Sequence, residues 1–264
     1  DRLTDKGLEI MEKQSKAGRP FFLNLWYHTV HTPIEGKPQL VKYYNEKIQP
    51  DSHWKNPHYA AMVHSLDENV GRVLTKVKDL GISDNTLVVF TSDNGGFVNR
   101  CKLHRELQVA NNFPLRSGKG SCYEAGVRVP CIVRWPGKVP SGRVSDAIFS
   151  TLDFMPTFAG LAGFKVPDDR VIDGVDQAQL LLGKDSQGAR QTFLYRNNGI
   201  RRGKWKYLKA KHNVYGYARD RKRAEVAELY DLDADIGETK NLAAGNPELI
   251  AELKQLMDKI TNRK

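Results

Sequence analysis

The chain has 264 residues, of which 40% are hydrophobic and 27% are charged, so it holds enough apolar material for a folded core and is not a disordered tail. Its three cysteines include no Cys-x-x-Cys pair, which excludes a disulfide miniprotein, argues against a zinc site and leaves the redox compartment open. The net charge of +10 permits anionic partners of any kind, including nucleic acid, acidic lipid and sulfated or phosphorylated substrates. No stretch approaches the about 20 apolar residues that cross a bilayer, so we expect a soluble protein.

The first half of the chain predicts a βαβ unit. The apolar run over residues 21–27 is typical of a buried strand. Residues 66–77 carry apolar side chains at helical spacing, and Gly81 follows where a C-terminal cap belongs. Residues 86–91 are β-branched and apolar, as in a parallel strand covered on both faces. Strand, helix and strand in this order indicate a βαβ unit.

Shorter elements are predicted further along. Residues 93–121 are rich in glycine and lack apolar periodicity, so we expect a long irregular loop with a functional reason for its length. A strand is predicted over 127–135, with Pro130 indicating an edge or a bulge. Short helices are predicted over 153–161 and 175–182.

The last third of the chain has a different residue pattern, with short alternating runs. Alternating runs at 192–195, at 199–208 around an Arg202-Gly203 turn, and at 228–232 predict a small antiparallel sheet. Asn246 as N-cap and Pro247 at the first helical position introduce a C-terminal helix with one apolar face. We therefore predict an α/β core portion over 1–185 and a small α+β subdomain over 186–264.

The segment Ser92-Asp93-Asn94-Gly95-Gly96 follows a predicted parallel strand, where open α/β sheets place their ligands. The carboxylate of Asp93 and the amide oxygen of Asn94 suit a hard cation such as Ca²⁺ or Mg²⁺, although two ligands are too few for a site. All these residue types also favour plain turns, and from the tetrapeptide alone the turn is the stronger interpretation.

Two other segments contain candidate catalytic or anion-binding residues. His28 and His31 follow the first predicted strand, where a histidine could act as a general acid or could simply hydrogen-bond its loop. In Ser117-Gly118-Lys119-Gly120-Ser121 a lysine between glycines could approach an oxyanion closely. The Walker A spacing is absent, and a lone Gly-Lys-Gly is more often a surface turn.

Taken in order, the motifs of this chain resemble those of the type I sulfatases of the alkaline phosphatase superfamily. The resemblance runs from about residue 21 to the C-terminus, and its most specific part is the lysine segment with the Tyr-Glu-Ala-Gly-Val-Arg-Val-Pro pattern after it. The segments that carry it are 31–33, 91–95, 118–130, 135–137, 152–157, 173–176, 202–207 and 228–232.

The resemblance implies an alkaline-phosphatase-like α/β fold, with a mixed, mainly parallel sheet between helices, and a sulfuric ester hydrolase of arylsulfatase type. It implies that Asp93 and Asn94 are Ca²⁺ ligands, that Lys119 grips the sulfate and that His31 lies near the leaving group. It assigns no role to His28. The substrate implied is an aryl sulfate or a sulfated sugar, with no nucleic acid or membrane as partner, and the location implied is the periplasm or the exterior of the cell.

The sequence also departs from the family. The family's nucleophile is a formylglycine made from Cys or Ser in a C/S-x-P-S-R motif, which does not occur here. We therefore expect the chain to be the C-terminal portion of a sulfatase, inactive alone, with a missing N-terminal segment as its partner. We also expect it to expose an apolar sheet edge and to aggregate in isolation.

Three alternatives stay open. The chain could be a catalytically silent module that binds anions or Ca²⁺, or part of a phosphodiesterase or phosphonate hydrolase on the same fold. The basic and aromatic stretch 201–223 could contact nucleic acid, a sulfated polysaccharide or the missing segment, but a solvated face of the small sheet is the leading interpretation.

Overall fold

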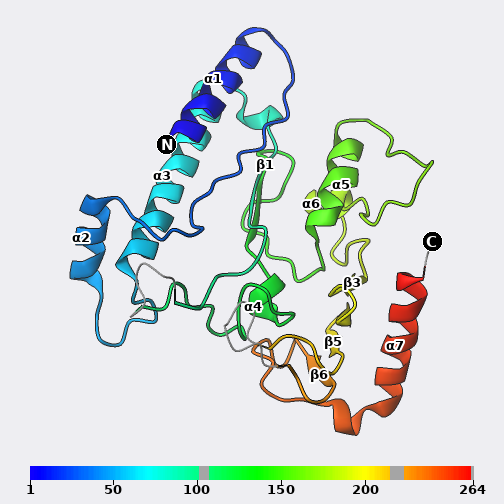
Figure 1. Cartoon of the computed structure of the whole chain (residues 1–264). Helices are drawn as coiled ribbons and strands as arrows, with labels where there is room; N and C mark the ends of the chain where they lie inside the picture. Colours follow the sequence, from blue (N-terminus) through cyan, green and yellow to red (C-terminus); the bar gives the residue numbers. More distant parts are fainter. Residues whose placement is uncertain (101–106, 215–222, 263–264) are drawn as a thin grey trace. The chain divides into compact units, whose positions relative to one another are not determined.

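The computed structural model describes residues 1–100, 107–214 and 223–262 (Figure 1). The chain forms two compact units: unit 1 contains Asp1–Val88 and Phe97–Asn111, and unit 2 contains Val89–Gly96 and Asn112–Lys264. These units do not test the predicted boundary between residues 185 and 186, which stays a prediction. Within the described residues, every helix is too short or too polar to cross a membrane.

Unit 1 is helical. It contains α1 (Arg2–Lys16), α2 (Pro38–Lys47), α3 (Pro57–Asp79) and the short 3-10 turn η1 (Ser83–Asn85), and both α1 and α2 pack on α3. The prediction of α3 is confirmed: Asn56 accepts a hydrogen bond from the N–H of Tyr59 at 3.1 Å, and Gly81 ends the helix with a φ of +68°. The helices α1 and α2 were not predicted from the sequence.

The strand predicted over residues 21–27 is wrong for the described structure, where these residues belong to no strand. Their side chains nevertheless alternate. Leu25 packs against Gly7 of α1 and Tyr27 hydrogen-bonds Thr4 at 2.9 Å, whereas Phe22 and Trp26 are 76% and 82% exposed. An extended segment becomes a strand only when a neighbouring strand pairs with it, and no described residue does so here.

Unit 2 begins with a two-stranded sheet of β1 (Val88–Thr91, whose first residue belongs to unit 1) and β2 (Cys131–Arg134). The predicted strand over 127–135 is too long, because residues Glu124–Val127 form the helical turn α4 and the N–H of Arg128 closes it on Glu124 at 2.7 Å. Pro130, which has no N–H to offer a sheet, precedes β2.

The first helices after β2 are short. A 3-10 turn, η2 (Thr151–Asp153), leads into α5 (Phe154–Leu161), as predicted, and α6 covers only Ala178–Leu181. The predicted helix over 175–182 begins late, and the residues before it are held by side chains instead: Asp153 accepts from the N–H of Val175, and Thr157 accepts from that of Gln177, each at 2.9 Å.

The small antiparallel sheet is confirmed. Its strands are β3 (Thr192–Leu194), β4 (Gly199–Arg202), β5 (Trp205–Leu208) and β6 (Glu228–Asp231), in the order β3-β4-β5-β6. A 3-10 turn, η3 (Ala243–Gly245), then leads to α7 (Pro247–Thr261), which lies alongside this sheet (Figure 1).

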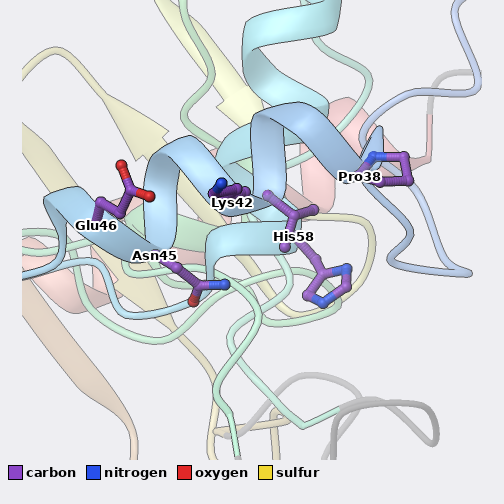
Figure 2. Close-up of a pocket in the computed structure, with 7 residues that line it drawn as sticks. Pro38, Lys42, Asn45, Glu46 and His58 are labelled. Carbon is purple, nitrogen blue, oxygen red and sulfur yellow. The ribbon is translucent and has the colours of Figure 1, made fainter.

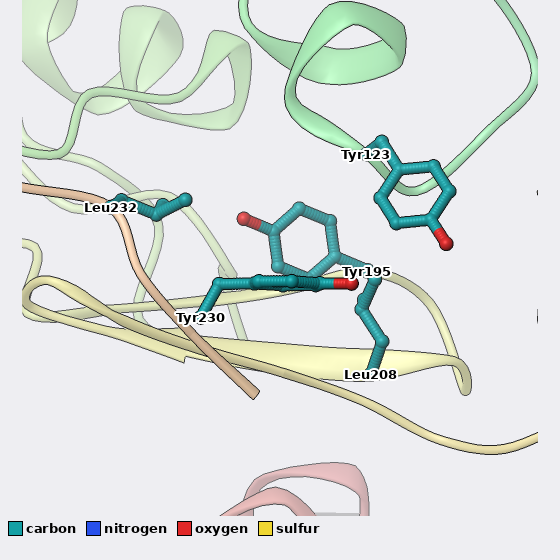
Figure 3. Packing of buried hydrophobic residues seen from close by; sticks show 5 residues of the cluster. All are labelled: Tyr123, Tyr195, Leu208, Tyr230 and Leu232. Atoms are coloured by element: carbon teal, nitrogen blue, oxygen red, sulfur yellow. The ribbon is translucent and has the colours of Figure 1, made fainter. Parts of the chain in front are cut away.

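The two faces of this sheet have different partners, because side chains alternate along each strand. On one face Ile200, Tyr207 and Leu229 pack against Leu253 and Met257 of α7. On the other face lie Tyr195, Leu208 and Tyr230, and they pack with Leu232 and with Tyr123, which comes from the loop before α4 (Figure 3). The sheet thus holds α7 on one side and the segment before α4 on the other.

Candidate functional site

The Asp93 turn lies directly after β1 and is compact. The hydroxyl of Ser92 donates to the carbonyl of Asn94 at 3.0 Å, and the Asn94 amide nitrogen donates to the carbonyl of Gly95 at 3.0 Å. Asp93 is exposed, whereas Asn94 is half-buried. The turn that the residue types predicted is present, and it leaves the carboxylate of Asp93 accessible.

Residues 116–126, here called the lysine loop, are joined to this turn by backbone hydrogen bonds. The N–H of Gly95 donates to the carbonyl of Gly126 at 3.1 Å, and the N–H of Lys119 donates to the carbonyl of Gly96 at 3.0 Å. A Cβ on Gly95 would lie 1.7 Å from the carbonyl oxygen of Ala125, so only glycine permits this approach. The structure therefore brings the predicted residues Asp93, Asn94 and Lys119 to adjoining segments.

The lysine loop is held in a defined shape. Ser117 has a φ of +65° and its hydroxyl donates to the carbonyl of Val214 at 2.8 Å. At the base of the loop the N–H of Ala125 donates to the carbonyl of Arg116 at 3.2 Å. A Cβ on Gly126 would lie 2.3 Å from the carbonyl oxygen of Ser121, so the chain is close-packed inside the loop. Half-buried Lys119 therefore projects from a fixed backbone rather than from a flexible surface turn.

The donor chemistry at the Asp93 turn fits a hard cation. A carboxylate oxygen and an amide oxygen are ligands that Ca²⁺ accepts, and Ca²⁺ takes 6–8 oxygen ligands in total. The described part of the chain contains no group of three or more His, Cys, Asp or Glu residues able to hold a metal ion. Asp93 and Asn94 would thus supply only part of a coordination sphere.

The two histidines lie together in unit 1. His31 Nδ1 and His28 Nε2 contact the same carbonyl, that of Thr32, at 3.0 and 3.2 Å. His31 Nδ1 also lies 3.3 Å from the Thr32 hydroxyl. A carbonyl only accepts hydrogen bonds, so in the tautomer that bonds to the Thr32 carbonyl these nitrogens are the donors. In that tautomer Nε2 of His31 is left for other partners, and both rings belong to exposed side chains.

A buried charged cluster lies behind the lysine loop, and the sequence analysis missed it. The ammonium of Lys206 on β5 lies 2.9 Å from Glu124 Oε1 and 2.7 Å from Glu238 Oε1, and all three side chains are at most 2% exposed. Burial acts to raise the pKa of Glu124, but the attraction of Lys206 and Arg128 outweighs it and the pKa falls below its usual range. For Glu238 burial prevails and the pKa is raised.

A second buried group adjoins the first. The hydroxyl of Tyr123 donates to the carboxylate of Glu228 at 2.8 Å, and His212 Nε2 lies 3.1 Å from the same carboxylate. Burial raises the pKa of Tyr123 and, against the attraction of Glu228, lowers the pKa of His212. The guanidinium of Arg116 lies over the Tyr123 ring at 4.0 Å and donates to the Tyr230 hydroxyl at 2.9 Å.

The interpretation of the basic stretch 201–223 as a solvated face is wrong for Lys206, which is fully buried. It fits Lys204, which is 43% exposed and pairs with Asp231 at 2.6 Å. The sequence pattern could not distinguish the buried lysine from the exposed one, because the carboxylates that pair with Lys206 lie far away along the chain. Residues 215–222 of the stretch, and Cys101, lie outside the described residues.

One surface pocket is lined by other residues. This pocket of about 430 Å³ in unit 1 lies against α2 and the start of α3 (Figure 2). Its lining residues are Gly36, Pro38, Val41, Lys42, Asn45, Glu46 and His58. None of the predicted site residues lines this pocket. The candidate site therefore consists of the Asp93 turn and the lysine loop.

The chain matches two family models of known proteins. The sulfatase family model matches residues 1–164, and the model of the N-sulphoglucosamine sulphohydrolase C-terminal region matches residues 118–264. The chain therefore belongs to the sulfatase family, as the order of its motifs predicted.

The relatives cover nearly all of this chain. A sulfatase of Formosa agariphila is 35% identical over 94% of the chain and 46% of its own length. An N-acetylgalactosamine-6-O-sulfatase of Bacteroides thetaiotaomicron is 30% identical over 100% of the chain and 51% of its own length. The chain thus spans about half the length of the curated relatives that it matches.

Solved structures agree on the fold. The crystal structure of Ps i-CgsB in complex with k-i-k-neocarrahexaose matches with a TM-score of 0.81 at 30% identity, over 99% of this chain and 54% of that one. The fold is therefore the alkaline-phosphatase-like α/β fold of the sulfatases, with a small antiparallel sheet and helix at its C-terminal end.

Proposed function

We propose that the whole protein hydrolyses sulfate esters and that this chain supplies Asp93, Asn94, Lys119 and His31 to the site. The observation that carries the proposal is the pair of backbone hydrogen bonds that joins the Asp93 turn to the lysine loop, from Gly95 to Gly126 and from Lys119 to Gly96. Membership of the sulfatase family supports the reaction class.

Cleavage of a sulfate ester expels an alkoxide or phenoxide, so negative charge grows on the bridging oxygen while the sulfuryl oxygens stay anionic. A fixed ammonium beside these oxygens stabilises that charge without reorganisation during the reaction. Lys119 suits this role because its backbone is held by the hydrogen bond to Gly96 and by the close packing of the loop.

His31 would deliver a proton to the leaving oxygen. Its Nδ1 already donates to the carbonyl of Thr32, so in the imidazolium form Nε2 carries the proton that can be given away. His28 shares the same carbonyl and would help to orient this loop.

Asp93 and Asn94 would hold Ca²⁺, together with oxygen ligands from outside this chain. When bound, the cation would draw charge from the non-bridging sulfuryl oxygens. The formylglycine nucleophile of the family would come from a segment that this chain does not contain.

The substrate that we propose is a sulfated sugar, with an aryl sulfate as a workable analogue. This rests on the relative named as an N-acetylgalactosamine-6-O-sulfatase and on the similar structure solved with a neocarrahexaose. Export from the cytoplasm is a further proposal that follows the family, and fractionation of cells that express the whole protein would test it.

The experiment is a substrate comparison with the whole protein. We expect hydrolysis of 4-nitrophenyl sulfate in the presence of Ca²⁺, and slower hydrolysis of 4-nitrophenyl phosphate, bis(4-nitrophenyl) phosphate and a 4-nitrophenyl phosphonate ester. Asp93→Ala should lower turnover by at least about tenfold, and Asp146→Ala, an exposed carboxylate of unit 2, should leave it unchanged.

Faster hydrolysis of a phosphorus ester would favour the phosphodiesterase or phosphonate hydrolase alternative. Absence of turnover together with retained Ca²⁺ binding would favour the silent binding module.

A further inference from the structure

The face of the C-terminal sheet that packs against the lysine loop carries charged side chains, where a core would normally be apolar. Side chains alternate along β5, so Lys206 and Leu208 share the face that packs against the lysine loop, while Tyr207 contacts α7. Register places Lys206 opposite Tyr230, and Leu208 opposite Glu228. A fully buried lysine is rare unless its charge is paired, so its partners should be tightly constrained.

Both partners of Lys206 hold the lysine loop. Glu124 is a residue of the loop, five positions after Lys119, and its carboxylate receives Lys206 at 2.9 Å and Arg128 at 2.6 Å. Glu238 lies beyond β6, and its carboxylate accepts the backbone N–H of Glu124 at 2.6 Å. The ammonium of Lys206 therefore bridges the loop to a distant segment of the chain.

Glu238 also holds the start of the loop. Its backbone carbonyl accepts from the guanidinium of Arg116 at 2.8 Å, and the carbonyl of Arg116 in turn accepts from Ala125 at 3.2 Å. Glu238 has a φ of +54°, a conformation that a non-glycine residue keeps only where its surroundings fix it. Both ends of the lysine loop thus meet at one residue whose carboxylate is paired with Lys206.

We propose that Lys206 is a positioning residue, whose buried ammonium clamps the lysine loop between Glu124 and Glu238 and so fixes where Lys119 lies. The consequence for catalysis rests on the proposed sulfatase function; the clamp itself does not. Without the ammonium, two carboxylates would face each other in a buried site, and the loop would separate from the sheet.

Hydrogen exchange in the whole protein tests the clamp directly. In Lys206→Met, which keeps the length of the side chain and removes its charge, peptides covering 116–128 should exchange at least about tenfold faster than in the unmodified protein. The matched control is Lys204→Met, which removes an exposed lysine two positions away, and exchange over 116–128 should not change there. Equal protection in both variants would overturn the proposal.

A double-mutant cycle separates positioning from a general structural role. Lys206→Met should lower kcat for 4-nitrophenyl sulfate by at least about tenfold, yet have little further effect when Lys119 is already alanine. Loss by the same factor in both backgrounds would contradict action through Lys119. If the unmodified protein hydrolyses no sulfate ester, the proposed function fails, and the exchange experiment still decides the clamp.

Should Lys206→Met fail to fold, Glu238→Gln replaces it. The amide oxygen can still accept the N–H of Glu124, but the ion pair with Lys206 is lost. We expect faster exchange over 116–128 in this variant also, and unchanged exchange would overturn the proposal.

Discussion

Gly95 and Gly126 share a backbone hydrogen bond of 3.1 Å, and through it the turn that follows β1 is fixed to the end of the lysine loop. The contact leaves no room for a side chain, since a Cβ on Gly95 would meet the carbonyl of Ala125 at 1.7 Å. Asp93 and Asn94 on one segment and Lys119 on the other thereby lie on adjoining segments, as the proposed site requires.

Gly95→Ala should separate these segments. Because the obstacle is backbone, the strain cannot be relieved by a side-chain movement, and overpacking of this kind costs about 1–3 kcal/mol of unfolding free energy. We expect lower stability in chemical denaturation of the whole protein and a loss of turnover. Gly71→Ala, in α3 with open space around its Cβ, should instead raise stability, by about 0.5–1 kcal/mol. Equal effects of the two substitutions would contradict this account.

Asp153 is expected to be structural, although it lies in a family-like segment. Its fully buried carboxylate pairs with Arg190 and accepts the N–H groups of Ser150 and Val175, each at 2.9 Å. Asp153→Ala removes the carboxylate that pairs with the nearly buried guanidinium of Arg190, which is 11% exposed, and should cost about 3–5 kcal/mol, measured by chemical denaturation. Asp169→Ala, which breaks an exposed pair with Arg170, should have no measurable effect. A small loss for Asp153→Ala would show that the hydrogen bonds from Arg190 to the carbonyls of Thr192 and Asp173 suffice to hold it.

The packing of α7 on the sheet should dominate the stability of the C-terminal part. Leu253 is fully buried against Ile200, Tyr207 and Leu229. Leu253→Ala should lower the unfolding free energy by about 2–5 kcal/mol, while Gln255→Ala, exposed on the same helix, should change it by less than about 0.5 kcal/mol. Similar melting temperatures for the two variants would argue that α7 is not docked.

Residues 1–264 expressed alone should self-associate. Phe22 and Trp26 alternate with less exposed residues and are 76% and 82% exposed, which makes an apolar surface. We expect oligomers in analytical ultracentrifugation, reduced by the combined Phe22→Ser and Trp26→Ser substitutions. A monodisperse monomer of high melting temperature would contradict this expectation.

The sequence predicted those parts of the fold that depend on local pattern. The helix before Gly81, the four short strands of the C-terminal sheet and the helix after Pro247 all have clear periodicity and punctuation, and each is present. The strand over 21–27 failed because pairing depends on a neighbour, which the pattern of one segment does not reveal. The helix α1 is clearly amphipathic and the sequence analysis overlooked it, whereas the apolar positions of α2 form a weaker pattern.

The site was predicted only in part, for a related reason. The order of the motifs pointed to Asp93, Asn94 and Lys119, and the structure brings their segments together through glycine. Lys206 escaped notice because its partner Glu238 lies in a loop beyond the next strand, so nothing local distinguishes it from a solvated lysine. The partners of such a long-range ion pair have no fixed spacing in the sequence, so the sequence alone does not reveal them.

The most direct test of the central claim is the effect of Lys119→Ala on kcat/KM for 4-nitrophenyl sulfate in the whole protein. The account predicts a loss of at least about tenfold, with no loss for Lys138→Ala, an exposed lysine in a turn of the same unit. An unchanged rate for Lys119→Ala would remove this residue from the site and contradict the account.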